Sequence, residues 1–220
     1  MSEFLAIFDV DGTLVDSEAI IVGTMVKAFS KSGVTPPEPD RIRSLIGLSL
    51  NRMIAMLAYG QSEAVVARIL ADYRLGFAQA VEASDPSELF PGVEAGLARL
   101  AQEGVILGIA TGKSKRGLDR LIESYRWGSL FVTRQCADFH PSKPHPSMIR
   151  QALTETGIDT DRAVMIGDSL YDIEMALAAG TPAIAVNWGY HPGAALRDAG
   201  AVALARDFDH LVDLILERAI

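Results

Sequence analysis

Five short apolar runs, each followed by a polar or glycine-containing turn and then by helical periodicity, constrain the fold of this chain most. The runs are continuously apolar, which is typical of strands that are buried on both faces of a sheet. Helices between the strands require parallel pairing. We therefore expect an α/β fold with a doubly wound, Rossmann-like parallel sheet, whose ligands bind at the carboxyl ends of the strands. The predicted strands cover residues 4–8, 105–110, 130–132, 163–166 and 183–186.

One long interruption of this alternation predicts a second domain. Between residues 15 and 85 the sequence shows helical patterns but no convincing strand, and a polar cluster from Ser84 to Ser87 marks the return to the core. The helical patterns cover residues 19–32, 52–57 and 63–83. We expect a small all-helical domain inserted after the first strand, with a hinge at its two connections. The predicted domains are an α/β core of residues 1–14 and 86–220 and a helical insert of residues 15–85.

Composition and charge argue against several classes of function. The formal net charge of −8 is a poor match for a protein that binds polyanions through its overall field, so we expect no nucleic-acid partner. Cys136 is the only cysteine, which excludes an intrachain disulfide and favours a reducing compartment. No uncharged run approaches the roughly 18 residues that a membrane span needs, and no signal peptide is apparent. The sequence therefore predicts a cytoplasmic protein without membrane contact.

Asp9 and Asp11 lie directly after the first predicted strand, in the sequence Asp-Val-Asp-Gly-Thr. Side chains at i and i+2 of an extended strand point to the same side, and Gly12 allows the backbone to turn sharply where a ligand approaches. This arrangement suits metal-assisted phosphoryl transfer, in which one carboxylate attacks phosphorus and the other handles a proton. Such a turn also closes many strands and can hold a structural Ca²⁺, so the motif alone leaves both explanations open.

Two later segments add groups that could hold a phosphate. Thr111, Gly112 and Lys113 follow the second predicted strand, where a hydroxyl and backbone N–H groups would meet phosphate oxygens at the start of a helix. Small-Gly turns are also ordinary between a strand and a helix. Lys143 lies in a segment that two prolines stiffen, so its side chain can point in a fixed direction. Its positive charge would offset the charges of the nucleophile and the phosphate.

Asp168 follows the fourth predicted strand, and Asp172 comes four residues later. If the next helix has begun, the second carboxylate lies one turn along on the same side, so both can face a metal. Mg²⁺ prefers an octahedral shell of oxygen atoms that keeps several waters, so these groups together with Asp9 and a backbone carbonyl would suffice. An N-cap role accounts for Asp168 alone, but it leaves the spacing to Asp172 and the companion carboxylate at Asp9 unexplained.

With these four segments assembled, the chain resembles the haloacid dehalogenase superfamily, specifically its phosphatase-like members with a helical cap after the first strand. The stretch from Asp9 to Ser17 looks most like phosphoglycolate phosphatases and their close relatives. The resemblance implies that Asp9 is the nucleophile and forms an aspartyl-phosphate, and that Asp11 protonates the leaving group and then activates water. It also implies a Mg²⁺ cofactor, held by Asp9, the backbone carbonyl of Asp11, Asp168 and Asp172. The implied phosphate-binding groups are Gly12, Thr13, Thr111, Gly112, Lys113 and Lys143, of which Thr111 and Lys143 also count as catalytic.

The expected substrate is a small phosphorylated metabolite, which the helical insert should select because the core contacts only the phosphoryl group and the metal. Residues 46–52 are predicted to face the core, with Gly47 permitting a close approach and Arg52 pairing with a carboxylate or second phosphate of the substrate. An exposed helical arginine is the alternative. The aromatic stretch 188–193 forms a rim of the cleft or packs at a core loop. The sequence predicts no particular oligomeric state.

Three functions compete on this pattern. A phosphatase is the leading interpretation, and a sugar-phosphate mutase is the alternative because mutases share the motifs and the type of cap. A dehalogenase is disfavoured because such enzymes do not place an aspartate two residues after the nucleophile, as Asp11 is placed here. A non-catalytic binding module of the same fold is disfavoured by the complete set of acidic and basic site groups.

Overall fold

The computed structural model describes residues 3–82 and 88–220 and contains one parallel sheet of six strands. The strand order is β3-β2-β1-β4-β5-β6, and every neighbouring pair is parallel. This topology confirms the predicted doubly wound α/β fold. The strands are β1 (Leu5–Phe8), β2 (Ile106–Thr111), β3 (Phe131–Cys136), β4 (Ala163–Gly167), β5 (Ala183–Val186) and β6 (Ala203–Ala205).

The predicted strands are present, with two differences at the edges of the sheet. β3 continues to Cys136, well beyond the predicted end at residue 132. The prediction ended too early because the residues of β3 alternate between buried and more exposed positions. Such alternation is normal for an edge strand but breaks the continuous apolar signal. β6 at the opposite edge has only three residues and was not predicted, because so short a run carries no periodicity.

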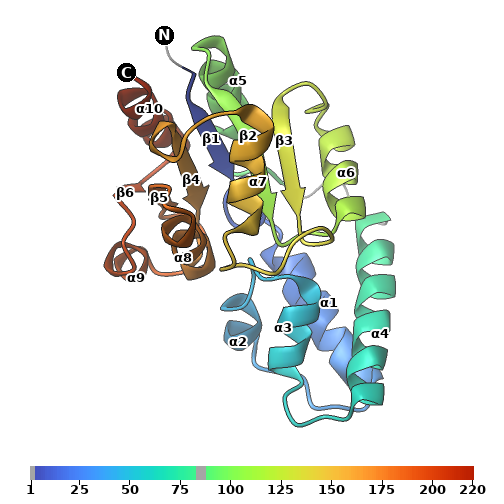
Figure 1. The fold of residues 1–220 in the computed structure, drawn as a ribbon. Helices are drawn as coiled ribbons and strands as arrows, with labels where there is room; N and C mark the ends of the chain where they lie inside the picture. The colour runs from blue at the N-terminus through green and yellow to red at the C-terminus, as the bar shows by residue number, and fades with distance from the viewer. Residues whose placement is uncertain (1–2, 83–87) are drawn as a thin grey trace.

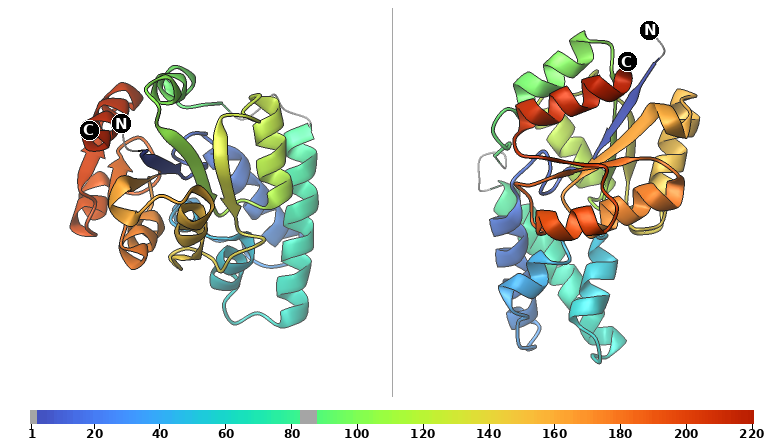
Figure 2. Two further views of the ribbon diagram at one scale, coloured as in Figure 1. Left: turned by 45° about the horizontal axis from the view of Figure 1, so that its top comes forward. Right: turned by 90° about the vertical axis from the view of Figure 1, so that its left-hand side faces the viewer.

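Helices cover both faces of the sheet and create two apolar layers (Figures 1 and 2). Successive side chains of β1 divide between these layers: Phe8 packs into one, and Ile7 into the other. The first layer is covered by α5 (Val93–Gln102), α6 (Lys115–Ser124) and α10 (Phe208–Ala219). The second is covered by α7 (Ser147–Thr156), α8 (Leu170–Ala179) and α9 (Gly193–Asp198), and a short 3₁₀ helix, η1 (Thr160–Arg162), leads into β4.

The inserted segment forms a group of helices beyond the carboxyl ends of the strands (Figure 1). Its helices are α1 (Glu18–Lys31), α2 (Pro39–Arg43), α3 (Leu50–Leu57) and α4 (Glu63–Glu82). Their apolar side chains form a third cluster, separate from the two core layers. The predicted boundary at residues 85 and 86 and the polar cluster from Ser84 to Ser87 lie outside the described residues, so the exact domain division stays a prediction.

The two connections between insert and core run side by side. The Asp16 N–H donates to the Glu88 carbonyl at 2.9 Å, and the Phe90 N–H donates to the Leu14 carbonyl at 3.1 Å. These hydrogen bonds join the segment that leaves the core to the segment that returns to it, at the two connections where a hinge was predicted. Of the helices that the structure describes, none is long and apolar enough to cross a membrane.

Candidate active site

Asp9 lies at the carboxyl end of β1, and its carboxylate is almost fully buried. Its Oδ1 accepts a hydrogen bond from the Val10 N–H at 2.7 Å and lies 2.9 Å from the Lys143 ammonium. Its Oδ2 is also buried and has no hydrogen-bond partner among the described residues. An unsatisfied buried carboxylate oxygen is costly, so this atom points to a ligand.

Lys143 is buried between two carboxylates. Its ammonium lies 2.9 Å from Asp9 Oδ1 and 2.6 Å from Asp172 Oδ1. Burial disfavours a charged lysine, but the two negative neighbours outweigh that effect and raise the pKa of Lys143 above its usual value. Lys143 is therefore a fixed positive charge beside Asp9. The sequence predicts such a charge there, to offset the negative charges of the nucleophile and the phosphate.

Asp168 and Asp172 stand at the end of β4 and in the first turn of α8. Asp168 accepts hydrogen bonds from the Thr13 hydroxyl at 3.0 Å and from the Tyr190 N–H at 2.9 Å. Asp172 binds Lys143 through Oδ1, and its Oδ2 accepts from the backbone and side chain of Ser169 in a capping box. Both oxygens of Asp172 are thus engaged, which makes it an orienting group for Lys143.

The three carboxylates described so far form a cluster that could hold a cation. Asp9, Asp168 and Asp172 each place an oxygen within 4.8 Å of the others. The pKa of Asp9 is raised to about 7: burial is the largest cause, Lys143 opposes it, and the charges of Asp172 and Asp11 reinforce it. The pKa of Asp168 is raised well above its usual value by burial and by the charges of Asp172 and Asp9. A hard divalent cation with a preference for oxygen, such as Mg²⁺, fits this donor set and would satisfy Asp9 Oδ2.

Asp11 is held away from this cluster by two partners. The Ser17 hydroxyl donates to Asp11 Oδ1, and the Lys113 ammonium lies 2.6 Å from Oδ1 and 2.9 Å from Oδ2. Lys113, predicted to bind phosphate, therefore neutralises Asp11 in this structure.

Gly12 and Thr13 contact Asp168 rather than the wall of the cavity described below. Gly12 has a φ of 86°, and a Cβ there would lie 2.3 Å from an oxygen of Asp168. The Thr13 hydroxyl donates to the other oxygen of the same carboxylate. The structure thus brings these two predicted phosphate ligands to the carboxylate cluster of Asp9, Asp168 and Asp172.

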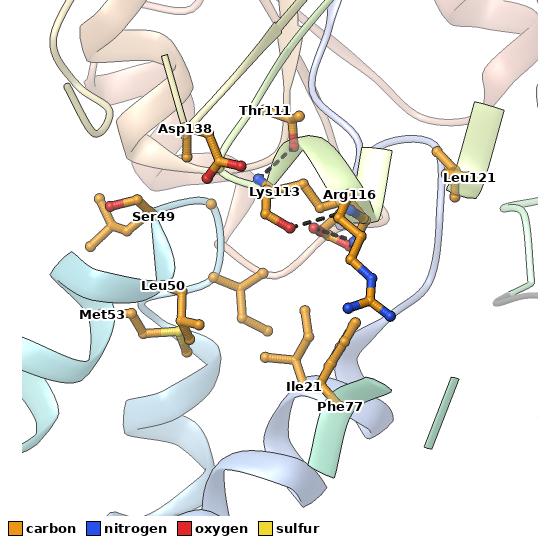
Figure 3. Close-up of a pocket in the computed structure, with 18 of the residues that line it drawn as sticks. Ile21, Ser49, Leu50, Met53, Phe77, Thr111, Lys113, Arg116, Leu121 and Asp138 are labelled. Atoms are coloured by element: carbon orange, nitrogen blue, oxygen red, sulfur yellow. Dashed lines mark hydrogen bonds and ion pairs between the residues drawn. The ribbon is translucent and has the colours of Figure 1, made fainter. Parts of the chain in front are cut away.

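A cavity of about 660 Å³ opens between the core and the inserted helices (Figure 3). Its core side includes the predicted residues Asp9, Asp11, Thr111, Gly112 and Lys113. Lys143, Asp168 and Asp172 do not line the cavity; the ion pair between Lys143 and Asp9 connects them to its wall. The structure therefore brings the four sequence motifs together: Thr111, Gly112 and Lys113, which are predicted to bind phosphate, line the cavity, and Lys143, Asp168 and Asp172 are buried behind Asp9.

Of the segment 46–52, which was predicted to face the core, residues 46–51 line the cavity between insert and core. The Ser49 N–H donates to the Ser142 hydroxyl at 2.9 Å, and a Cβ on Gly112 would lie 2.5 Å from the Gly47 carbonyl oxygen. The prediction for Arg52 differs from the structure: its side chain is exposed and lies outside the cavity wall. Helical spacing explains this, because α3 turns its neighbours toward the cavity and the buried cluster while Arg52 faces solvent.

Several cavity residues were not predicted. Arg116 and Arg120 extend from α6, and Tyr73 and Phe77 from α4. Each pair has the i, i+4 spacing of one helix face, so a search for repeated arginine or aromatic spacing next to the phosphate motif could have found them. Sequence periodicity alone assigns such residues to the surface or to the core.

The aromatic loop after β5 packs around Asp168 and against the insert. The Trp188 indole N–H donates to the Thr13 carbonyl at 3.1 Å, and a Cβ on Gly189 would lie 2.1 Å from Asp168 Cβ. The Tyr190 hydroxyl accepts a hydrogen bond from the Ser17 N–H at 3.0 Å. Of the two alternatives for this loop, packing is what the structure shows, since the loop is absent from the cavity wall as described.

Comparisons with known proteins agree with this geometry. The chain is 35% identical over 211 residues to a probable phosphatase, IndB, from Dickeya dadantii, covering 94% of this chain and 91% of the relative. It is 31% identical over 225 residues to a phosphoglycolate phosphatase from Rhodospirillum rubrum, covering 94% and 88%. A crystal structure of a predicted phosphatase from Clostridium acetobutylicum superposes with a TM-score of 0.86 at 27% identity, covering 98% of this chain and 100% of that one.

A family-wide sequence model, described as haloacid dehalogenase-like hydrolase, matches residues 6–186. The matched range begins inside β1 and ends with β5, so it includes Asp9, Lys143 and Asp168 together with the inserted helices. The chain therefore belongs to the haloacid dehalogenase-like hydrolases.

Proposed function

We propose that the protein is a Mg²⁺-dependent phosphatase that hydrolyses the phosphate monoester of a small metabolite through an aspartyl-phosphate at Asp9. The observation that carries this proposal is the state of Asp9. Asp9 lines the cavity, its carboxylate pairs with a buried lysine, and one of its buried oxygens has no hydrogen-bond partner in the part of the chain that the structure describes. A structural aspartate would have both oxygens satisfied.

The first step forms a bond between an Asp9 carboxylate oxygen and phosphorus, and breaks the bond from phosphorus to the ester oxygen. Asp11 gives its proton to the departing oxygen. Lys113 is bound to Asp11 in the structure, so an incoming phosphate would compete for the ammonium and free Asp11 for this role. Lys143 offsets negative charge on Asp9 and phosphate throughout.

The second step returns Asp9 to its starting state. Asp11 accepts a proton from water as the water oxygen attacks phosphorus, and the bond to Asp9 breaks with release of inorganic phosphate. Thr111 and the backbone of Gly112 line the cavity beside these groups and would hold phosphate oxygens.

Asp9 and Asp168 would hold the cation, with the Asp11 carbonyl as a further oxygen donor and Asp172 acting through Lys143 and Ser169. When bound, Mg²⁺ screens the negative charge of the carboxylates and the phosphate.

Asp9→Asn tests the proposal. The amide has nearly the same volume but is a poor nucleophile, so the variant should fold and lose phosphate release from a panel of phosphate monoesters. The measurement is inorganic phosphate released with Mg²⁺, together with a thermal melt of both proteins. A folded Asp9→Asn protein with a wild-type rate contradicts the role of Asp9. If the wild-type protein converts a phosphate ester into its isomer and releases no free phosphate, the result would instead identify the protein as a mutase.

A further inference from the structure

The cavity continues beyond the phosphate-binding groups as a groove between α6 and α4. On α6 its lining residues recur once per turn, at Arg116, Arg120 and Ser124, and on α4 they recur at Tyr73, Phe77 and Val81. Each set occupies one helix face. From Arg116 to Ser124 the axis of α6 advances by about 12 Å. The groove is therefore long compared with a two-carbon phosphate ester such as phosphoglycolate.

The two walls of this groove differ in chemistry. The wall from the insert is mainly apolar and aromatic: Tyr73 and Phe77 stack with ring centroids 5.7 Å apart, and Ile21, Leu50 and Met53 also line it (Figure 3). Its polar members are Ser49, Asn51 and Arg74, of which Arg74 donates to Asn51 Oδ1 at 3.4 Å. The opposite wall on α6 carries cations. An organic body with an apolar face and an acidic group would match both walls.

Of the basic residues at this end of α6, Arg116 is the one without a partner among the described residues. Lys113 pairs with Asp11, Lys115 pairs with Asp119, and Arg120 donates to the Val81 carbonyl at 3.2 Å. Arg116 makes no such contact, and Figure 3 shows its guanidinium extended into the cavity toward Ile21 and Phe77. A guanidinium that has no ion-pair partner among the described residues and lines a groove is suited to a planar, bidentate acidic group.

Building on the proposed phosphatase function, we propose that Arg116 is a specificity-determining residue that binds a second acidic group of the substrate. The substrate class is a phosphate monoester whose acidic group is separated from the ester by an apolar body of about the size of a ring, which packs against Phe77. A ring would cover the exposed part of Phe77, whereas the single methylene of phosphoglycolate would leave Phe77 in contact with water.

Two matched aryl esters test this assignment. 4-Carboxyphenyl phosphate carries the second acidic group, and 4-carbamoylphenyl phosphate replaces it with a neutral amide of the same shape. The measurement is kcat/KM for each ester with wild type, Arg116→Ala and Arg116→Gln. Comparing the ratio of the two esters between proteins removes their difference in intrinsic reactivity. Lys115→Ala is the matched control, because it removes a positive charge from the same helix outside this cavity.

We expect the preference for the carboxylate ester to fall roughly tenfold in both Arg116 variants, the scale of one charge-assisted hydrogen-bonded pair. The amide ester should be hydrolysed within about twofold of wild type, and Lys115→Ala should keep the wild-type preference. Wild type should also hydrolyse the carboxylate ester with a higher kcat/KM than phosphoglycolate.

An unchanged preference in the folded Arg116 variants would overturn the role of Arg116. If phosphoglycolate is hydrolysed faster than 4-carboxyphenyl phosphate, the proposal that the substrate has an apolar body of about the size of a ring is overturned. Both results leave phosphate release itself intact, so they differ from a failure of the proposed function, in which wild type releases no phosphate from any ester.

Discussion

The floor of the active site and the groove beside it are built in opposite ways. This floor consists of Asp9 in the cavity wall and of Lys143 and Asp168 buried behind it. All three are almost fully buried and are held by short polar contacts. In the groove, Arg116 is exposed and Phe77 half-buried, and both project from helix faces. The floor is therefore suited to one fixed reaction, whereas the groove can change its chemistry by single substitutions that leave the fold intact.

Replacing Lys143 should give the largest effect, because it tests the fixed charges of the floor. Lys143→Met keeps a long side chain but leaves Asp9 and Asp172 buried without their cation. We expect kcat to fall by roughly 10²–10³-fold and the free energy of unfolding of the metal-free protein to fall by about 3–5 kcal/mol at pH 8. Steady-state kinetics and denaturant unfolding measure the two quantities. A variant that keeps wild-type kcat would place Lys143 outside the reaction.

Magnesium should stabilise the protein more at pH 8 than at pH 5.5. In the metal-free protein the pKa of Asp9 is raised to about 7, so stability from its protonated form is present below about pH 4 and is lost as the pH rises through 7. A cation needs the ionised carboxylate and relieves its cost, so its benefit grows over the same range.

Thermal melts with and without Mg²⁺ at the two pH values measure this difference. At a fixed concentration of 100 times the Kd that holds at pH 8, Mg²⁺ should contribute about 2.7 kcal/mol of stability at pH 8 and less at pH 5.5. Asp9→Asn is the control, because removing the titrating group should shrink the dependence on pH. Equal stabilisation at both pH values in wild type would argue against cation binding by Asp9.

Substituting Phe77 should give the smallest effect, because it alters the groove and leaves the floor unchanged. Phe77→Leu removes the ring stacked on Tyr73 while keeping an apolar side chain. We expect kcat/KM for aryl esters to fall by about threefold to tenfold, with little change for phosphoglycolate. Tyr59→Leu, at an exposed position of the insert, is the control. An equal loss for all substrates would mean that Phe77 serves closure of the insert rather than substrate choice.

The sequence by itself determined the sheet and the floor of the site. Continuous apolar runs identify strands buried on both faces, and Asp9, Thr111 and Asp168 lie at or directly after the ends of such runs. Parallel strands bring their carboxyl ends to one edge, so these residues had to meet there. The edge strand β6 and the end of β3 were missed because short or alternating segments carry a weaker signal.

Only the tertiary structure decided which charges are compensated and which residues form the groove. The sequence predicts phosphate binding for Lys113 and substrate binding for Arg52, and the structure adds that Lys113 is paired with Asp11 and that Arg52 faces solvent. Arg116 and Phe77 are about forty residues apart in the chain, and they share a groove only because α4 of the insert lies opposite α6 of the core. Helix periodicity tells which residues share a face, but the packing of the insert on the core decides what that face meets.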